Sequence, residues 1–405
     1  MSNLALPLID AAPRLRKAAT GESVSAPADA GLAVEVVRTR AGFEALEGDW
    51  NELFERAGTS AQLFQSFNWC WHWSNHFLAG NDVASLGPRL SILVVRRHGR
   101  VVSIWPLVVE RSLGIARMTW LGDPVSQYGD ALIDAKAISE PELADAVLGA
   151  ARTARVHLLH LRKTRADAAA APVLARIGTA IVATEEAPYL DLSSAPDYPT
   201  YEARYSGHAR RNRRRLLRRL NEHAVTGLEY HQTGPAARDL ATVGISMKRA
   251  QLAARSDVSR ALADERFYRF IADVAASSSR PVEMLVSSLR SGGEIAAVQI
   301  AVAGKGRMAM HVIVVASKFE RFGAGLLHLE STIRRAKEQG VTCFDLLAPR
   351  HDYKMAWADG TTAVHDHALP MTVAGRAFIA GVLDLKPALK RAFSRLPPPV
   401  RRVIG

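Results

Sequence analysis

Apolar residues recur in turn at strand spacing and at helix spacing along this chain. Residues 32–37 are rich in β-branched side chains, which predicts a strand. Two sets of bulky residues then repeat at the spacing of one helix face: Phe43, Leu46, Trp50, Leu53 and Phe54, and Trp69, Trp73 and Phe77. The folded part of the chain is therefore expected to open with a strand and two amphipathic helices.

The rest of the first half predicts strands with helices between them. Strands are expected at residues 91–96, 101–109, 116–121, 131–133, 156–161 and 181–184. Helices are expected at residues 140–153 and 172–177. His98 and Gly99 form a tight turn between the first two of these strands, so an antiparallel pair is predicted there.

The second half predicts the same mixture with longer elements. Helices are expected at residues 198–223, 235–254 and 264–276, and strands at residues 228–231, 281–289, 295–303 and 308–315. Glycines separate the last three strands, which predicts an antiparallel meander. Gly323 and Gly325 then open a helix that Gly340 ends, and residues 341–347 form the next strand.

These elements predict an α/β protein whose mixed, mostly antiparallel sheets are flanked by helices. A chain of 405 residues exceeds what one core usually organises, so two halves are expected. We divide the chain into a flexible leader (1–31), an N-terminal half (32–190), a C-terminal half (191–375) and a basic amphipathic tail (376–405). The tail could cover the protein's own surface or lie on an anionic membrane.

Charge and cysteine content narrow the partners and the compartment. Lysine and arginine number 52 against 40 acidic residues, and the net charge of +12 favours phosphate-bearing ligands, nucleic acid or anionic membrane. Two cysteines are too few for a disulfide framework, which fits the cytoplasm. No run approaches the about 18 apolar residues that a transmembrane helix needs. We therefore expect a cytoplasmic protein with at most peripheral contact with the inner membrane.

The turn of Arg321, Gly323, Ala324 and Gly325 lies between the last strand of the meander and the next helix. Glycines there let backbone N–H groups approach a pyrophosphate, and the helix N-terminus adds about half a unit of positive charge. The turn resembles the one on which GNAT enzymes hold coenzyme A. It departs from their pattern because Glu320 takes the basic position and Arg321 is shifted by one. A plain glycine turn that opens a helix is the alternative.

A second motif follows in residues 343–357, where Phe-Asp ends a strand and Tyr-Lys follows after a short loop. This order resembles CelD-type and Fem-type transferases of the GNAT-like superfamily. An ammonium at the end of a strand can stabilise the oxyanion formed when an amine or hydroxyl attacks a thioester. Lys354 is therefore our first catalytic candidate, with Asp345 beside it and Tyr353 as a substrate contact. An ordinary ion pair of Asp345 with Lys354 is the alternative.

The resemblance to the CelD-type group, which is linked to cellulose and exopolysaccharide synthesis, extends over most of residues 43–370. It implies tandem GNAT-like halves and acetyl-CoA, or another acyl-CoA, as the donor. In the family, the segment that matches Tyr128, Gly129 and Asp130 lies beside the acceptor. The resemblance therefore makes Asp130 a candidate general base and Tyr128 a substrate contact. A carboxylate that tightens a turn is the structural alternative for Asp130.

Eight arginines crowd the helix expected at residues 198–223: Arg204, Arg210, Arg211, Arg213, Arg214, Arg215, Arg218 and Arg219. Apolar residues at a spacing of four leave one stripe for packing, so the arginines fan over the other faces. We expect Arg210, Arg211 and Arg214 to bind an anionic group, such as coenzyme A phosphates or a nucleotide-linked sugar. A solvated face without a ligand is the alternative.

The sequence lacks the residue patterns that metal binding and several other reaction types require. His365 and His367 would share one strand face, but no third ligand has suitable spacing, so no metal is expected. The sequence contains neither a Gly-x-Ser-x-Gly nucleophile motif nor a Walker A loop. Direct transfer is therefore expected, with positioning and oxyanion stabilisation lowering the barrier.

The predicted function is transfer of an acyl group, in the first place acetyl from acetyl-CoA, to an amine or hydroxyl of a sugar or glycan intermediate. This prediction rests on the resemblance more than on the chemistry. Two alternatives stay open. One is a non-catalytic GNAT-fold scaffold of a polysaccharide synthase, and the other is a Fem-type peptidyltransferase that uses aminoacyl-tRNA.

Overall fold

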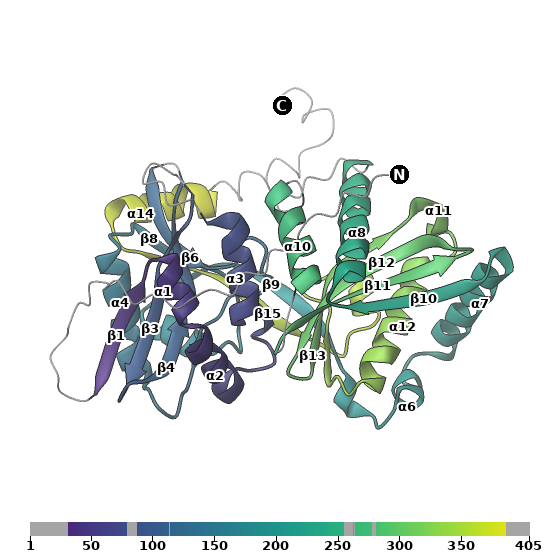
Figure 1. Ribbon diagram of the computed structural model, residues 1–405, viewed down its shortest axis with the longest axis horizontal. Coiled ribbons are helices and arrows are strands. Elements are labelled where there is room, and N and C mark those ends of the chain that lie inside the picture. The colour runs from purple at the N-terminus through teal and green to yellow at the C-terminus, as the bar shows by residue number, and fades with distance from the viewer. Residues whose placement is uncertain are drawn as a thin grey trace, which may run out of the picture.

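The computed structural model describes residues 31–78, 87–112, 114–254, 262, 264–277 and 281–385. Two lobes lie side by side in Figure 1, and the long strands β9 (Ala180–Asp191) and β15 (Gly360–Pro370) run between them. Residues 1–30 of the expected leader, and the expected tail beyond residue 385, lie outside the described residues.

The remaining strands belong to two sheets. They are β1 (Leu32–Val37), β2 (Arg89–Leu90), β3 (Ile92–Arg97), β4 (Arg100–Trp105), β5 (Leu107–Ser112), β6 (Ile115–Trp120), β7 (Leu132–Ile133), β8 (Leu158–Arg165), β10 (Thr226–Gln232), β11 (Glu283–Ser291), β12 (Glu294–Gly304), β13 (Arg307–Val315) and β14 (Cys343–Asp345). Each stretch expected to be a strand contains one, but residues 101–109 are divided between two strands, and β9 continues to Asp191, beyond the expected end at residue 184.

Helices flank both sheets. They are α1 (Arg40–Ala45), α2 (Glu47–Ala57), α3 (Phe67–Phe77), α4 (Glu140–Thr153), α5 (Ala171–Arg176), α6 (Tyr198–Glu202), α7 (Gly207–His223), α8 (Pro235–Ala254), α10 (Glu265–Ser277), α11 (Ser317–Glu320), α12 (Ala324–Glu338), α13 (Asp352–Met355) and α14 (Val373–Phe378). Short 3₁₀ turns lie at Leu63–Gln65 and Leu192–Ser194, and a π-helical turn at Ile379–Leu385.

One large sheet extends through both lobes. Its strand order is β10-β11-β12-β13-β14-β9-β15-β8-β6-β5-β2, and a smaller sheet has the order β1-β3-β4-β7. The pairs β13–β14 and β6–β8 are parallel, whereas the other pairs are antiparallel. The predicted mixed, mostly antiparallel α/β fold is therefore confirmed. Because β15 pairs with β8 and β9, the chain returns to the N-terminal lobe after building the C-terminal one.

The single strand expected at residues 101–109 is wrong, because Pro106 divides it. β4 ends at Trp105 and joins the small sheet, whereas β5 begins at Leu107 and joins the large one. Proline has no N–H to donate to a ladder, so the chain can change sheets at this residue.

The single helix expected at residues 198–223 is also wrong. α6 ends at Glu202, and α7 begins at Gly207 after a turn. The Ser206 hydroxyl accepts a hydrogen bond from the N–H of Ala209 at 3.1 Å, which caps the new helix.

The helices of the C-terminal lobe cover opposite faces of β10 to β13. Val298 and Ile300 point into the core shared with α8 and α10. Ala297 and Ala301, which alternate with them, contact apolar residues of α12. Figure 1 shows α8 and α10 on one side of these strands and α12 and α7 on the other.

Candidate active site

β13 and β14 lie side by side for three residues and then part. Their parallel pairing runs from Arg307 with Cys343 to Ala309 with Asp345. β13 continues to Val315, whereas β14 ends at Asp345. In the part of the chain that the structure describes, the C-terminal half of β13 therefore has no strand partner on this side. An unpaired strand edge can hydrogen-bond an extended ligand.

A bulge in this strand sets His311 apart from the regular ladder. Met310 and Val312 pair with the consecutive residues Ala301 and Ile300 of β12, so His311 between them has no partner residue in the ladder. Its Nε2 lies 3.1 Å from the carbonyl oxygen of Val125, so Nε2 carries the proton and donates it. Nδ1 is buried and finds no partner among the described residues. Because burial lowers the pKa of His311 to about 4, the ring is neutral at pH 7 and Nδ1 keeps a free lone pair.

Lys248 on α8 lies beside the same strand edge. Its ammonium donates to the carbonyl oxygen of Ile313 at 3.2 Å and to the side-chain oxygen of Gln251 at 3.2 Å. In an antiparallel ladder the N–H and C=O of one residue point to the same side. The Ile313 N–H therefore points to the open edge as well, next to a cationic side chain.

The turn before α12 forms as expected. Gly323 has a left-handed φ of 69° at the N-cap, and no side chain caps the helix. A Cβ on Gly323 would lie 2.8 Å from Leu216, and one on Gly325 would lie 2.7 Å from Val315. Packing alone thus requires both glycines. Arg321 is exposed, with its guanidinium 4.8 Å from the centre of the ring of the neighbouring phenylalanine.

Asp345 is fully buried where the two lobes meet. It accepts hydrogen bonds from the Tyr128 hydroxyl at 2.9 Å and the Leu347 N–H at 2.8 Å. Its ion pairs are with Arg307 at 2.7 Å and Arg165 at 3.4 Å. Burial, and then the charge of Asp345, raise the pKa of Tyr128, so its hydroxyl stays protonated. These bonds connect β14 with the N-terminal lobe.

Lys354 lies on α13 and is buried. Its ammonium donates to the carbonyl oxygens of Leu347 at 2.8 Å and Pro349 at 2.9 Å, so two of its three donors hold the loop after β14. Burial lowers the pKa of Lys354 to about 8. Tyr353 is 52% exposed and stacks on His351 with ring centres 6.0 Å apart.

Asp130 is buried in the N-terminal lobe and has four hydrogen-bond donors around it. The Gln62 amide donates at 2.9 Å, and the N–H groups of Ala131, Ala169 and Ala170 donate at 2.8, 3.1 and 2.9 Å. Two of these N–H groups, those of Ala169 and Ala170, belong to the turn that leads into α5, so the carboxylate holds the chain just before this helix. Burial raises its pKa to about 6 in spite of these bonds.

The arginines of α7 differ in their surroundings. Arg213 is buried and pairs with Glu330 at 2.7 Å and Glu202 at 3.3 Å, so the expectation that all eight lie on outer faces is wrong. Arg210 is half-buried, whereas Arg211 and Arg214 are exposed. The exposed arginines form a basic face of α7: Arg211, Arg214, Arg215, Arg218 and Arg219.

His311 and Lys248 are functional candidates that the sequence alone did not single out. The signal available was weak, because a histidine within a β-branched strand and a lysine within a long helix are both common. The described residues contain no group of three or more His, Cys, Asp or Glu side chains placed to hold a metal ion. The same residues include no helix with the length and apolar character needed to cross a bilayer.

The site lies within a segment that matches a known family. Residues 207–355 match the family model described as acetyltransferase (GNAT) domain. The matched segment runs from the start of α7 to the end of α13 and includes the open edge of β13 and the turn before α12. The search among curated proteins found no match.

Solved structures with a similar fold span both lobes. FemX covers 84% of this chain and 98% of its own, with a TM-score of 0.56 and 10% identity. The C-terminal domain of a protein from Agrobacterium fabrum, described as a lysylphosphatidylglycerol synthetase, covers 84% and 97%, with a TM-score of 0.51 and 13% identity. At these identities the similarity shows the fold alone.

Proposed function

We propose that this protein is an acyltransferase that moves an acyl group from an acyl-CoA thioester to an amine or hydroxyl. The observation that carries the proposal is the open edge of β13 beside the uncapped N-terminus of α12, within the matched GNAT domain. An extended pantetheine arm could hydrogen-bond this edge as an added strand would.

The turn at Gly323, Ala324 and Gly325 would hold the donor phosphates. The Gly323 N–H already donates to the carbonyl oxygen of Glu320 at 2.9 Å, but no side chain caps the helix that Ala324 begins, and the helix dipole favours an anion there. α7 packs against this turn through Leu216, which brings a helix with five exposed arginines to the donor end of the site. The exposed Arg321 adds a further positive charge, which Glu320 next to it partly offsets.

The proposed chemistry is direct transfer. The acceptor nitrogen or oxygen attacks the thioester carbonyl carbon, and the carbonyl oxygen becomes an oxyanion beside the Ile313 N–H and the Lys248 ammonium. His311 Nδ1 takes the proton from the acceptor. The oxyanion then re-forms the carbonyl as the C–S bond breaks, and the leaving thiolate takes the proton from His311 to become the free thiol. His311 Nδ1 is a buried hydrogen-bond acceptor without a partner, which costs free energy. The N–H or O–H group of the acyl-accepting substrate would supply the missing hydrogen bond and offset this cost.

The residues singled out from the sequence enter this proposal in supporting roles. Lys354 holds the loop after β14, and Asp345 holds the contact with Tyr128 and Arg165 of the N-terminal lobe. We propose that they position the acceptor side of the site, together with Tyr128 and Tyr353. We place Asp130 in the same group, because its carboxylate fixes the start of α5. The proposed acceptor is a sugar or glycan intermediate, which is the class that the CelD-type resemblance implies.

Thiol release tests the proposal. Purified protein would be incubated with acetyl-CoA and octanoyl-CoA and a panel of amino sugars, sugars and amines. We expect turnover to fall at least about a hundredfold in His311→Asn and about tenfold in Lys248→Met. His98→Asn and Lys136→Met, at exposed positions of the N-terminal half, should keep the native rate. Calorimetry that finds no binding of either thioester to the native protein would remove the donor from the proposal.

A second candidate is transfer from aminoacyl-tRNA, which the basic face of α7 favours. Its exposed arginines could neutralise several phosphates of an RNA backbone, and such binding weakens steeply with salt. Filter binding with total tRNA at two salt concentrations would compare native protein with the double variant Arg214→Glu/Arg218→Glu. Salt-sensitive binding that the double variant loses would support aminoacyl-tRNA as the donor in place of acyl-CoA. Thioester binding without any turnover would instead support the non-catalytic scaffold.

A further inference from the structure

A pocket lies between α12 and the sheet, away from the proposed donor turn. Strands β10 to β13 line it together with Thr332 and Arg335 from the C-terminal half of α12 and Gln339, which follows that helix. It encloses about 500 Å³ of empty space, part of it open to solvent. Arg335 follows Gly323 by twelve residues, which corresponds to about 18 Å along a helix. The pocket is therefore a different site from the one proposed for the donor phosphates.

The inner end of the pocket is polar and incompletely hydrogen-bonded. The Thr332 hydroxyl donates to the side-chain oxygen of Gln299 at 2.7 Å, and Ser287 and His328 are paired at 2.9 Å. Gln299 is only 1% exposed, yet its Nε2 has no partner among the described residues. The neighbouring His328 Nδ1 is also unpaired, and burial lowers the pKa of that histidine to about 3. Buried polar atoms without partners indicate a place for a ligand or water oxygen.

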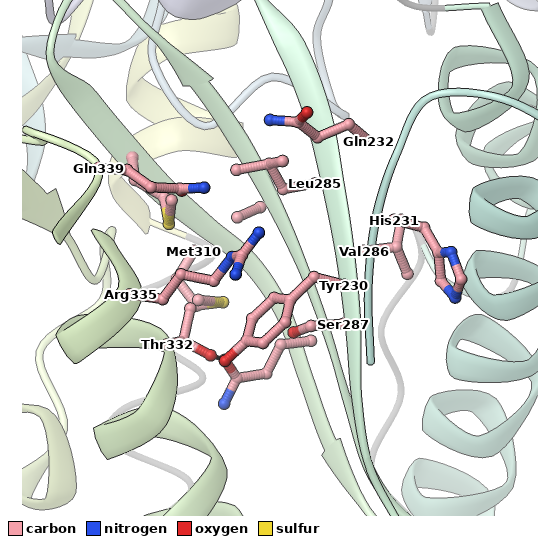
Figure 2. A pocket seen from close by; sticks show the side chains of 13 residues that line it. Tyr230, His231, Gln232, Leu285, Val286, Ser287, Met310, Thr332, Arg335 and Gln339 are labelled. Atoms are coloured by element: carbon pink, nitrogen blue, oxygen red, sulfur yellow. Dashed lines mark hydrogen bonds between the residues drawn. The ribbon is translucent and has the colours of Figure 1, made fainter. Parts of the chain in front are cut away.

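The walls between the inner end and the rim are apolar. Ala301, Met308 and Met310 line them and are almost fully buried. Leu285 also lines the pocket, and Ala301 pairs with Leu285 of β11 on one side and with Met310 of β13 on the other; Leu285 and Met310 are labelled in Figure 2. Methionine side chains adapt to irregular shapes, so these walls can accept a flat ring or a short chain.

The rim carries one positive charge. Arg335 reaches from α12 across the pocket, with its guanidinium 4.2 Å from the centre of the Tyr230 ring, and both are seen in Figure 2. None of the residues that line the pocket is acidic. Burial raises the pKa of Tyr230, so its hydroxyl stays neutral. His231 points away from the cavity in Figure 2. The rim therefore favours an anion, and a planar carboxylate suits a guanidinium.

We propose that this pocket binds a small organic acid. Its carboxylate lies at Arg335, its apolar body lies between the methionines, and a hydroxyl or carbonyl oxygen at its far end accepts a hydrogen bond from Gln299. The site holds a second ligand besides the proposed acyl donor.

Three related probes test the proposal by ligand-observed NMR: 3-(4-hydroxyphenyl)propionate, 3-phenylpropionate, which lacks the far oxygen, and 3-(4-hydroxyphenyl)propionamide, which lacks the charge. We expect native protein to bind the first most tightly. Arg335→Gln should weaken it about tenfold and leave the amide unchanged. Gln299→Leu should bring the two acids to equal affinity, because the inner donor is gone.

Arg334→Gln is the matched control. Arg334 is the next residue on the same helix, stacks on Tyr198 at 4.8 Å and does not line the pocket. The Arg334→Gln variant should bind all three probes as the native protein does. Arg335 is exposed, so its variant should fold even if Gln299→Leu does not. The proposal is overturned if native protein binds none of the probes at millimolar concentration, or if Arg335→Gln and Arg334→Gln bind them equally.

Discussion

At the scale of single residues, the type of a side chain did not decide its role in this protein. Asp130 and Lys354 have the chemistry of a general base and an oxyanion stabiliser. In the structure each makes several hydrogen bonds to the backbone, which fix a helix start and a loop. His311, in contrast, keeps one ring nitrogen free at a strand bulge. The proposed site therefore rests on atoms without a hydrogen-bond partner more than on residue types.

Asp130 gives a pH-dependent prediction. Its pKa in the folded protein is about 6, above the ordinary value of 3.8, so the native state binds this proton at higher pH than the unfolded chain does. The contribution of Asp130 to stability therefore rises as the pH falls from about 6 to about 4, by up to about 3 kcal/mol. Asp130→Asn lacks this gain.

Urea unfolding at pH 7 and pH 4.5 measures the effect. The gap in free energy of unfolding between native protein and Asp130→Asn should widen at the lower pH. Asp145→Asn removes an exposed carboxylate from α4 and should show no such widening. If the difference in free energy of unfolding between native protein and Asp130→Asn were the same at both pH values, the pKa of Asp130 would not be raised in the folded protein.

At the scale of elements, the pair of α7 and α12 organises the donor end of the proposed site. Leu216 of α7 packs against Gly323, and Arg213 of α7 pairs with Glu330 of α12. The guanidinium of Arg213 also lies 5.0 Å from the centre of the Trp357 ring. One stripe of α7 is thus committed to packing, and its exposed arginines remain available to an anion.

Gly323→Ala should destabilise the protein through strain and through a clash. The residue has a left-handed φ of 69°, which costs about 1 to 2 kcal/mol for other residues, and a Cβ would approach Leu216 to 2.8 Å. In a Leu216→Ala background the clash disappears and the cost of Gly323→Ala should shrink. Gly340→Ala is the control, since φ is 77° and nothing lies near its Cβ. Equal costs of Gly323→Ala in both backgrounds would rule out the clash.

Arg213→Met should destabilise the protein by about 3 kcal/mol, because two largely buried glutamates lose their partner. Arg214→Met, on the exposed side of the same helix, should change stability by no more than about 0.5 kcal/mol. Thermal unfolding measures both. Similar effects of the two substitutions would show that Arg213 is not a structural ion-pair partner.

At the scale of the whole molecule, the two lobes are joined by strands and by a buried polar network. β9 pairs with β14 of the C-terminal lobe and with β15. Asp345 on β14 binds Tyr128 and Arg165 of the N-terminal lobe. We infer that the lobes unfold together, because the strands of one sheet cross between them.

Asp345→Asn should destabilise both lobes in a single transition. The change removes the ion-pair partner of the largely buried Arg307 and the weaker of the two partners of Arg165, which keeps Asp167 at 2.8 Å, and we expect a cost of about 3 kcal/mol. Tyr128→Phe removes one hydrogen bond and should cost about 1 kcal/mol. The double variant should cost less than the sum, since both act on one network. Two separate unfolding transitions in calorimetry would contradict the coupling of the lobes.

The sequence by itself determined the periodic elements and the fold class. The helix expected at residues 140–153 and the strands of the C-terminal meander appear within a few residues of their predicted bounds, because burial of one face imposes a period that can be read locally. The glycine turn before α12 could also be predicted locally, because glycine is the residue that most readily adopts the left-handed conformation found at Gly323.

Only the tertiary structure decided which polar groups are used and which are free. The change of sheet at Pro106, the division of α6 from α7 and the burial of Arg213 depend on neighbours far apart in sequence. The same holds for the free nitrogen of His311 and the unpaired amide of Gln299. A hydrogen-bond partner is a matter of distance in space, and periodicity along one segment carries no information about it.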